Sequence, residues 1–183
     1  MGSNNYPLVW VIMGVSGAGK TLIGRRFSAQ MESDFLEGDR RHSRSNIFKM
    51  RSHQPLQDGD RQQWLMELEA DICRAILHER ETVLTCSALK VTYRNQLTAP
   101  GRVQLIWLNV PEEELERRLA QRSHHYMKLD MLHSQIEAFE PLEPEEDAIV
   151  VNGFQPPDQV IEELLNKITE KFPALEKDWW QRI

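Results

Sequence analysis

The sequence predicts an α/β fold built on a doubly wound, parallel sheet of five strands. Short apolar runs alternate with helical patterns, and several runs are apolar throughout, as strands buried on both faces of a sheet are. No internal repeat or long linker interrupts this alternation, which is typical of βαβ units. A glycine-rich turn separates the first apolar run from the first helical pattern. The five expected strands are residues 9–13, 34–36, 83–86, 103–108 and 148–151.

Three further helices are predicted from apolar residues that recur at steps of three and four. The clearest begins at about Asp58 or Asp60, either of which suits an N-cap, and ends at about residue 79. Another follows Pro111, and the last spans about 157–172 with a wide apolar stripe. The segments 38–59 and 121–144 are polar and poor in strand signals. We therefore expect them to be binding loops or lids.

Length, charge and cysteine content limit the class of protein. The 183 residues predict a single domain, and the formal net charge of −6 disfavours binding to a nucleic-acid backbone. The longest apolar run is too short to cross a membrane. Because two cysteines are too few for a disulfide scaffold, we expect Cys73 and Cys86 to be reduced and buried. These features favour a soluble cytoplasmic protein in which any anion site is local.

The glycine-rich turn matches a phosphate-binding loop. Residues 14–21 fit G-x-x-x-x-G-K-[ST] between a strand and a helix, the context that the motif requires. Lys20 would supply charge at the β and γ phosphates of ATP, and Thr21 a hydroxyl for Mg²⁺. The guanine-reading N-K-x-D pattern is absent from the sequence, so a small-molecule kinase is favoured over a GTP-driven switch. The predicted ATP-binding residues are Gly14, Ser16, Gly17, Ala18, Gly19, Lys20 and Thr21.

Three further motifs follow the phosphate-binding loop. They are Gly38-Asp39 with His42, Pro55-Leu56 with Asp58 and Arg61, and Cys86-Ser87-Ala88-Leu89-Lys90 with Tyr93-Arg94. Together with the loop, over about residues 9–151, they resemble the motifs of the short gluconokinases, a shikimate-kinase-like P-loop family. The resemblance implies a P-loop kinase fold with a lid, and transfer of the γ-phosphoryl group of ATP, with Mg²⁺, to the 6-hydroxyl of D-gluconate.

Polar residues in the expected substrate-binding segment, about 38–60, are candidates to hold the acceptor. Asp39 follows the second strand at the carboxyl edge of the sheet, where it could accept a hydrogen bond from the attacking hydroxyl or hold Mg²⁺ through water. Its alternative role is to cap the next segment. Arg61 and Arg44 are candidates to clamp a carboxylate, with surface ion pairing as the alternative. His42 either bonds a sugar hydroxyl or is a solvated loop histidine.

Residues after the third strand complete the expected substrate site. The resemblance implies that Ser87 and Lys90 face the substrate, although Lys90 would equally suit an exposed helix start. Tyr93 and Arg94 lie one turn further on and would support them. Gln135 is likewise implied to bind substrate, and it belongs to a segment with Glu137 and Glu140 that would fasten the lid helix.

The resemblance places a lid at about residues 121–132. Arg118 and Arg122 lie four residues apart on one helix face and would approach the transferring phosphoryl group. With Lys20 and Asp39 they form the predicted catalytic set. For Arg118 the alternative is an ordinary surface pair with Glu114.

Departures from the family pattern leave the acceptor open. Another small hydroxyl compound, such as a shikimate-like or other sugar acid, is the alternative acceptor, and a catalytically weak nucleotide-binding protein is the second alternative. The positions that differ include Ser43, Ser45, Gln57, Gln63 and Ser123.

Histidines and tryptophans near the lid and the tail have no role in this scheme. His124, His125 and His133 lack the cysteine or carboxylate pair of a zinc pattern, so we expect lid or solvated side chains. Trp179 and Trp180 are too apolar to stay in water, and would pack on a helix or in a homodimer contact.

Overall fold

Five parallel strands form one sheet. The computed structural model describes residues 7–52, 54–121, 129–173 and 175. The strands lie in the order β2-β3-β1-β4-β5, and every neighbouring pair is parallel. The predicted doubly wound, five-stranded sheet is therefore confirmed. The strands are β1 (Val9–Met13), β2 (Asp34–Glu37), β3 (Thr82–Cys86), β4 (Val103–Asn109) and β5 (Ile149–Asn152).

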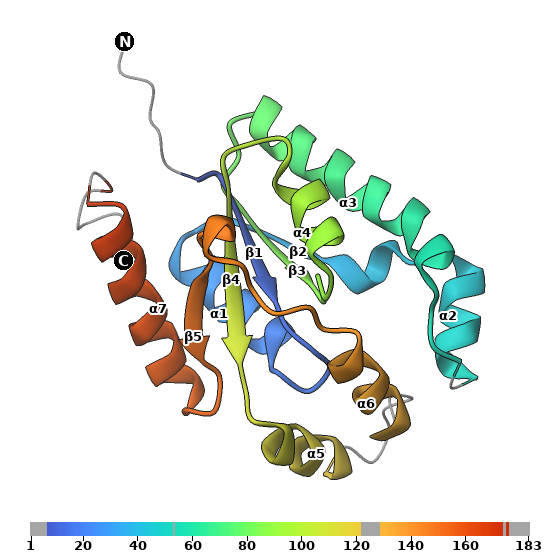
Figure 1. Cartoon of the computed structure of the whole chain (residues 1–183). Coiled ribbons are helices and arrows are strands. Elements are labelled where there is room, and N and C mark those ends of the chain that lie inside the picture. The colour runs from blue at the N-terminus through green and yellow to red at the C-terminus, as the bar shows by residue number, and fades with distance from the viewer. Residues whose placement is uncertain (1–6, 53, 122–128, 174, 176–183) are drawn as a thin grey trace.

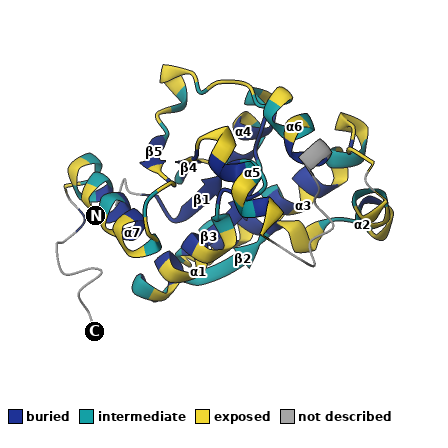
Figure 2. Cartoon of the chain, turned by 90° about the horizontal axis from the view of Figure 1, so that it is seen from below, coloured by how far each residue is buried: buried dark blue, intermediate teal, exposed yellow. Residues whose placement is uncertain are grey.

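Helices cover both faces of the sheet, which explains why all residues of β1 and β3 are buried. One core cluster joins the sheet to α1 (Lys20–Gln30) and α7 (Pro157–Lys171), and a second joins it to α3 (Asp58–Leu77) and α4 (Val91–Thr98). Figure 1 shows α3 and α4 together, with α7 on the opposite side. In Figure 2 the central strand β1 is buried, the edge strand β2 is intermediate in burial, and the helices expose their outer faces.

The carboxyl ends of the strands point toward two short helices, α5 (Glu112–Ala120) and α6 (Leu129–Glu137) (Figure 1). α5 has three acidic residues in its first turn and two arginines in its last, which favours this helix because the charges oppose its dipole. β2 and β3 lie on one side of β1, and β4 and β5 lie on the other, so the strand order reverses at β1. Doubly wound sheets bind ligands at this point.

The segment between β2 and α3 differs from the expected loop. It contains a 3₁₀ turn, η1 (Gly38–Arg41), and α2 (Arg44–Arg51). The backbone N–H of Asn46 donates to the hydroxyl of Ser43, which caps α2. The buried Asn46 amide donates to the carbonyl of Asp60 at 2.6 Å. α2 is thus held by tertiary contacts with the start of α3 rather than by an apolar stripe.

Two smaller expectations are wrong. Gln57, not Asp58 or Asp60, is the N-cap of α3, and the Asp60 carboxylate instead accepts the Gln57 backbone N–H at 3.0 Å. Cys73 is exposed on the outer face of α3, whereas Cys86 is buried as expected. A further 3₁₀ turn, η2 (Pro144–Glu146), precedes β5. Among the described residues, no helix is both long and apolar enough to span a membrane.

Candidate active site

The predicted phosphate-binding loop connects β1 to α1 at the carboxyl edge of the sheet. Gly17 and Gly19 have φ angles of 87° and 98°, a left-handed conformation that glycine adopts without strain. Lys20 is the first residue of α1, and its Nζ donates a hydrogen bond to the carbonyl of Val15 at 3.0 Å. The N–H of Gly14 donates to the Ser87 carbonyl at 3.3 Å. Loop glycines followed by a helix start form a site suited to phosphate.

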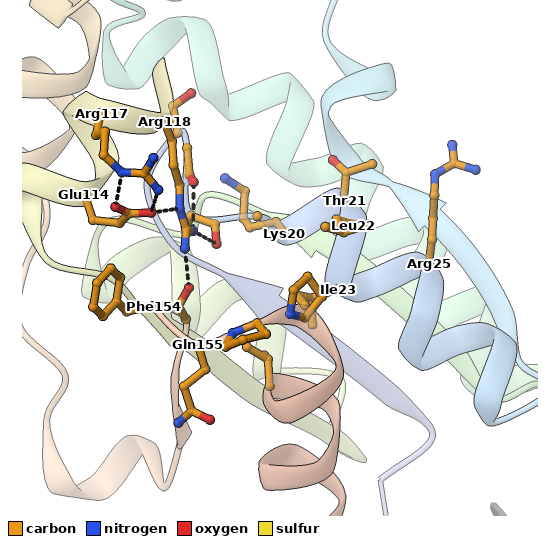
Figure 3. A pocket seen from close by; sticks show the side chains of 18 of the residues that line it. Lys20, Thr21, Leu22, Ile23, Arg25, Glu114, Arg117, Arg118, Phe154 and Gln155 are labelled. Carbon is orange, nitrogen blue, oxygen red and sulfur yellow. Dashed lines mark hydrogen bonds and ion pairs between the residues drawn. The ribbon is translucent and has the colours of Figure 1, made fainter. Parts of the chain in front are cut away.

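A cleft of about 990 Å³ opens along this loop (Figure 3). Its walls come from the loop, from α5 and from the turn between β5 and α7. A cleft of this size with a phosphate cradle suits a nucleotide, and we call it the nucleotide cleft. Besides residues 16–21, its lining includes Asp39, Glu114, Arg117, Arg118, Phe154 and Gln155.

Arg118 stands at the wall of the nucleotide cleft. Its Nε donates to Glu114 Oε1 at 2.6 Å, and its Nη2 donates to the carbonyl of Gly153 at 2.8 Å (Figure 3). Hydrogen bonds from Arg117 and then Arg118 lower the pKa of Glu114 to about 2, so this carboxylate is ionised at neutral pH. The pairing with Glu114 expected as the alternative is therefore present, and it holds the Arg118 guanidinium in the cleft wall.

A second cavity of about 60 Å³ adjoins the nucleotide cleft, and we call it the smaller pocket. It is bounded by the segment after β2, the start of α3, the end of β3 and α6. Ser16, Lys20 and Asp39 line both cavities. Two ligands, one in each cavity, would therefore meet beside these three residues. The lining also includes His42, Arg61, Trp64, Ser87 and Gln135.

His42 forms part of the smaller pocket and is stacked on Trp64. The ring centroids are 4.4 Å apart and the planes are inclined by 13°. Trp64 Nε1 donates to the Gly38 carbonyl at 2.8 Å, which ties the stack to η1. Burial lowers the pKa of His42; the Asp39 carboxylate opposes this effect and Arg61 adds to it. The ring is thus neutral at pH 7, and its buried Nδ1 has no hydrogen-bond partner among the described residues.

The two arginines predicted to clamp a carboxylate lie in different places. Arg61 is 16% exposed and lines the smaller pocket, with its guanidinium 6.0 Å from the centroid of the Tyr93 ring. Arg44 is exposed at the start of α2. Lys90 donates to both carboxylate oxygens of Asp58, at 2.9 and 2.8 Å, and is the N-cap of α4. It lines neither the nucleotide cleft nor the smaller pocket.

Glu37, the last residue of β2, is a site residue that the motifs do not reveal. Its Oε1 accepts hydrogen bonds from Thr21 Oγ1 at 3.1 Å and from Thr85 Oγ1 at 2.8 Å. The carboxylate therefore lies beside the hydroxyl predicted to contact Mg²⁺, and hard oxygen donors of this kind fit that ion. The sequence did offer one signal for Glu37: it is an acidic residue at the carboxyl end of a strand, the edge where such sheets bind ligands.

The segment after the expected lid contacts the phosphate-binding loop. Gln135 Oε1 accepts the backbone N–H of Ser16 at 2.7 Å, and Glu140 Oε2 accepts that of Val91, at the start of α4, at 2.6 Å. Glu137 is exposed on α6. The other expected lid and tail residues lie outside the described residues: Arg122, Ser123, His124, His125, Trp179 and Trp180.

A P-loop kinase is the class of protein that this fold and the pair of adjoining cavities define. A family model described as an AAA domain matches residues 9–142. The gluconokinase of Gluconobacter oxydans (strain 621H) is 37% identical, over 87% of this chain and 90% of the relative. The chain belongs to the gluconokinase family.

Solved structures agree with this assignment. The crystal structure of a gluconokinase from Sinorhizobium meliloti 1021 is similar with a TM-score of 0.83 and 30% identity, and covers 98% of this chain and 99% of that one. Shikimate kinase from Aquifex aeolicus vf5 has a TM-score of 0.58 at 17% identity, covering 92% of this chain and 99% of that one. At that identity the likeness concerns the fold alone.

Proposed function

We propose that this chain transfers the γ-phosphoryl group of ATP to the 6-hydroxyl of D-gluconate, giving 6-phospho-D-gluconate and ADP. The observation that carries the proposal is the meeting of the two cavities at Ser16, Lys20 and Asp39. Phosphoryl transfer needs donor and acceptor held in line and in contact. Membership of the gluconokinase family supports gluconate as the acceptor. We further propose that the chain acts as one kinase domain in the cytoplasm.

Lys20 and Asp39 have complementary tasks in this reaction. The bond from the γ-phosphorus to the β–γ bridging oxygen breaks while a bond from the acceptor oxygen forms, and negative charge spreads over the phosphoryl oxygens. Lys20, with the loop N–H groups, stabilises that charge. Asp39 accepts the hydrogen bond of the attacking hydroxyl and receives its proton.

Thr21, with Glu37 beside it, would hold Mg²⁺, and Asp39 could reach the same ion through water. The support is the Thr21–Glu37 hydrogen bond, which brings a hydroxyl and a carboxylate together at the phosphate-binding loop. When bound, the ion would neutralise charge on the β and γ phosphates.

The smaller pocket matches the groups of gluconate. Arg61 would clamp the carboxylate, and the neutral ring of His42 would bond a hydroxyl through Nδ1. Ser87 and Gln135 add two polar side chains to the lining. The volume of about 60 Å³ is small for a six-carbon acid, so we expect the walls to move apart as it enters.

A coupled assay of ADP release tests the proposed acceptor. Gluconate, shikimate, other sugar acids and nucleoside monophosphates are compared at equal concentration with ATP and Mg²⁺. We expect gluconate to give by far the highest turnover. Background turnover with gluconate beside clear turnover with another acceptor would contradict the proposal. ATP binding without turnover on any acceptor would indicate a catalytically weak nucleotide-binding protein.

Arg61→Ala should raise the KM for gluconate by at least about tenfold and leave the KM for ATP nearly unchanged. Losing one partner of a charge-assisted pair costs about 1.5–3 kcal/mol, and each 1.4 kcal/mol is a factor of ten. Arg44→Ala is the matched control, because Arg44 was also a candidate by sequence but is exposed on α2. Steady-state kinetics, with gluconate and ATP varied in turn, measures the two KM values separately. Equal loss of ATP affinity in Arg61→Ala would point to structural damage.

A further inference from the structure

We propose that Glu112, Glu116 and His133 bind one divalent transition-metal ion between α5 and α6, and that Zn²⁺ suits them best. Each side chain offers one donor atom, and the three atoms all lie within 4.8 Å of one another. None of the three residues lines the nucleotide cleft or the smaller pocket. The site is therefore separate from the groups proposed to transfer phosphate.

The distances fit a tetrahedral ion. His133 Nε2 lies 2.8 Å from Glu116 Oε1 and 3.8 Å from Glu112 Oε1. Ligand atoms bonded at ~2.0–2.1 Å to a tetrahedral Zn²⁺ are ~3.3 Å apart. The two observed distances bracket this value, so small rotations of exposed side chains would complete the geometry. Water can occupy the fourth position, because the three side chains are 41–53% exposed.

The local charges favour a cation at this place. Glu112 and Glu116 are one turn apart on α5, where like charges repel each other. Their neighbour Glu114 is paired with Arg117 and Arg118, whereas Glu112 and Glu116 both face His133. One imidazole with two carboxylates is a ligand set for Zn²⁺, while Mg²⁺ prefers oxygen ligands alone.

A bound ion would join two helices that each contact the nucleotide cleft or its loop. α5 supplies Arg118 to the cleft wall, and α6 supplies Gln135 to Ser16 of the phosphate-binding loop. Sequence spacing gives no sign of this site, because the two carboxylates lie on α5 and the imidazole comes from α6. The ion would therefore hold α5 and α6 together.

Calorimetric titration with Zn²⁺, in excess Mg²⁺, tests the site in a Cys73→Ser background. The Cys73 thiol is exposed and would itself bind zinc. Burial raises the pKa of Cys86 to about 12, so this thiol stays protonated and needs no change. We expect one Zn²⁺ per chain. His133→Asn and Glu116→Gln should each weaken binding by at least about tenfold, since changing even the partners of metal ligands costs that much.

Controls separate this site from other histidines. His78→Asn changes an exposed histidine at the end of α3 and should leave zinc affinity unchanged. Co²⁺ titration should give a visible spectrum of nitrogen and oxygen ligation that disappears in His133→Asn. Unchanged affinity in His133→Asn, or binding that depends instead on His124 and His125 in a double asparagine variant, would overturn the proposal. These experiments measure zinc binding and not kinase turnover with Mg²⁺. A negative result would therefore leave the kinase assignment unaffected.

Discussion

Lys20→Ala should transfer phosphate about 10²-fold more slowly than the parent protein, or slower still, the scale of removing one electrostatic stabiliser of a transition state. Lys20 lines both the nucleotide cleft and the smaller pocket, so its ammonium lies where the proposed donor and acceptor would meet. Because negative charge shifts toward the β–γ bridging oxygen during transfer, where Lys20 would stabilise it, kcat and kcat/KM should fall together. Steady-state kinetics with ATP and gluconate measures both.

The matched control for this variant is Lys167→Ala. Lys167 pairs with Glu163 on α7, on the face of the sheet away from the smaller pocket, and lines neither cavity. It should keep the parent rate. Alanine favours the first turn of α1, so Lys20→Ala should stay folded, which its thermal unfolding would verify. Retention of half the activity in Lys20→Ala would contradict the placement of the transfer site.

The sheet and the phosphate-binding loop could be predicted because their signals are local. The strands are short apolar runs, and the loop motif is contiguous between a strand and a helix, so neither depends on distant residues. α2 shows the opposite case. Its sequence has no apolar stripe, and it is held by the contact of Asn46 with Asp60, which only the folded chain brings together.

The sequence predicts Thr21 and Gln135 as site residues, but it reveals neither their contacts nor Glu37, because these contacts join distant parts of the chain. Thr21 and Thr85 both donate to Glu37, although they come from α1 and β3. Gln135 meets Ser16 across 119 residues of chain. No spacing rule joins such pairs, because the parallel sheet brings successive strand ends together only after each helix has crossed over. Phe154, in the turn after β5, also lines the nucleotide cleft, far along the chain from the phosphate-binding loop.

Arg94 is a supporting residue whose importance is visible only in the structure. Its side chain is fully buried and forms an ion pair with Glu146, itself 6% exposed. The guanidinium also donates hydrogen bonds to four backbone carbonyls from two separate segments. These are the carbonyls of Ala88 and Leu89 after β3, and of Glu140 and Pro141 after α6. Arg94 thus fastens the segment after Ser87 to the segment after Gln135.

Arg94→Met should lower the free energy of unfolding by about 3–5 kcal/mol, because it leaves a buried carboxylate without its partner. For a chain of this size that is a fall in Tm of roughly 10 °C. Calorimetry or chemical denaturation measures the loss. Arg26→Met, which breaks a surface pair with the 91% exposed Asp158, should cost no more than about 1 kcal/mol. An equal cost for the two variants would contradict the role assigned to Arg94.

The pH dependence of stability provides a test of the Arg94–Glu146 ion pair. Burial alone would raise the pKa of Glu146, but hydrogen bonds from Arg94 and the Glu143 N–H, with the guanidinium charge, bring it below its usual value. In the parent, this carboxylate therefore contributes stability above pH ~4.3, which is lost as pH falls through its folded pKa. In Arg94→Met burial without the guanidinium should raise the pKa of Glu146 instead. The loss of stability relative to the parent protein should therefore become smaller as Glu146 is protonated at low pH.

Arg94→Met combined with Glu146→Met should recover part of the lost stability at neutral pH, since no charge is then buried. Recovery should stay incomplete, because the four carbonyls lose the hydrogen bonds from Arg94 in either background. Arg94→Lys should also be less stable than the parent protein. A lysine ammonium has three donors and cannot reproduce the planar guanidinium, which donates in several fixed directions at this site. A double variant less stable than Arg94→Met would show that Arg94 acts through packing, and would refute the buried-charge account.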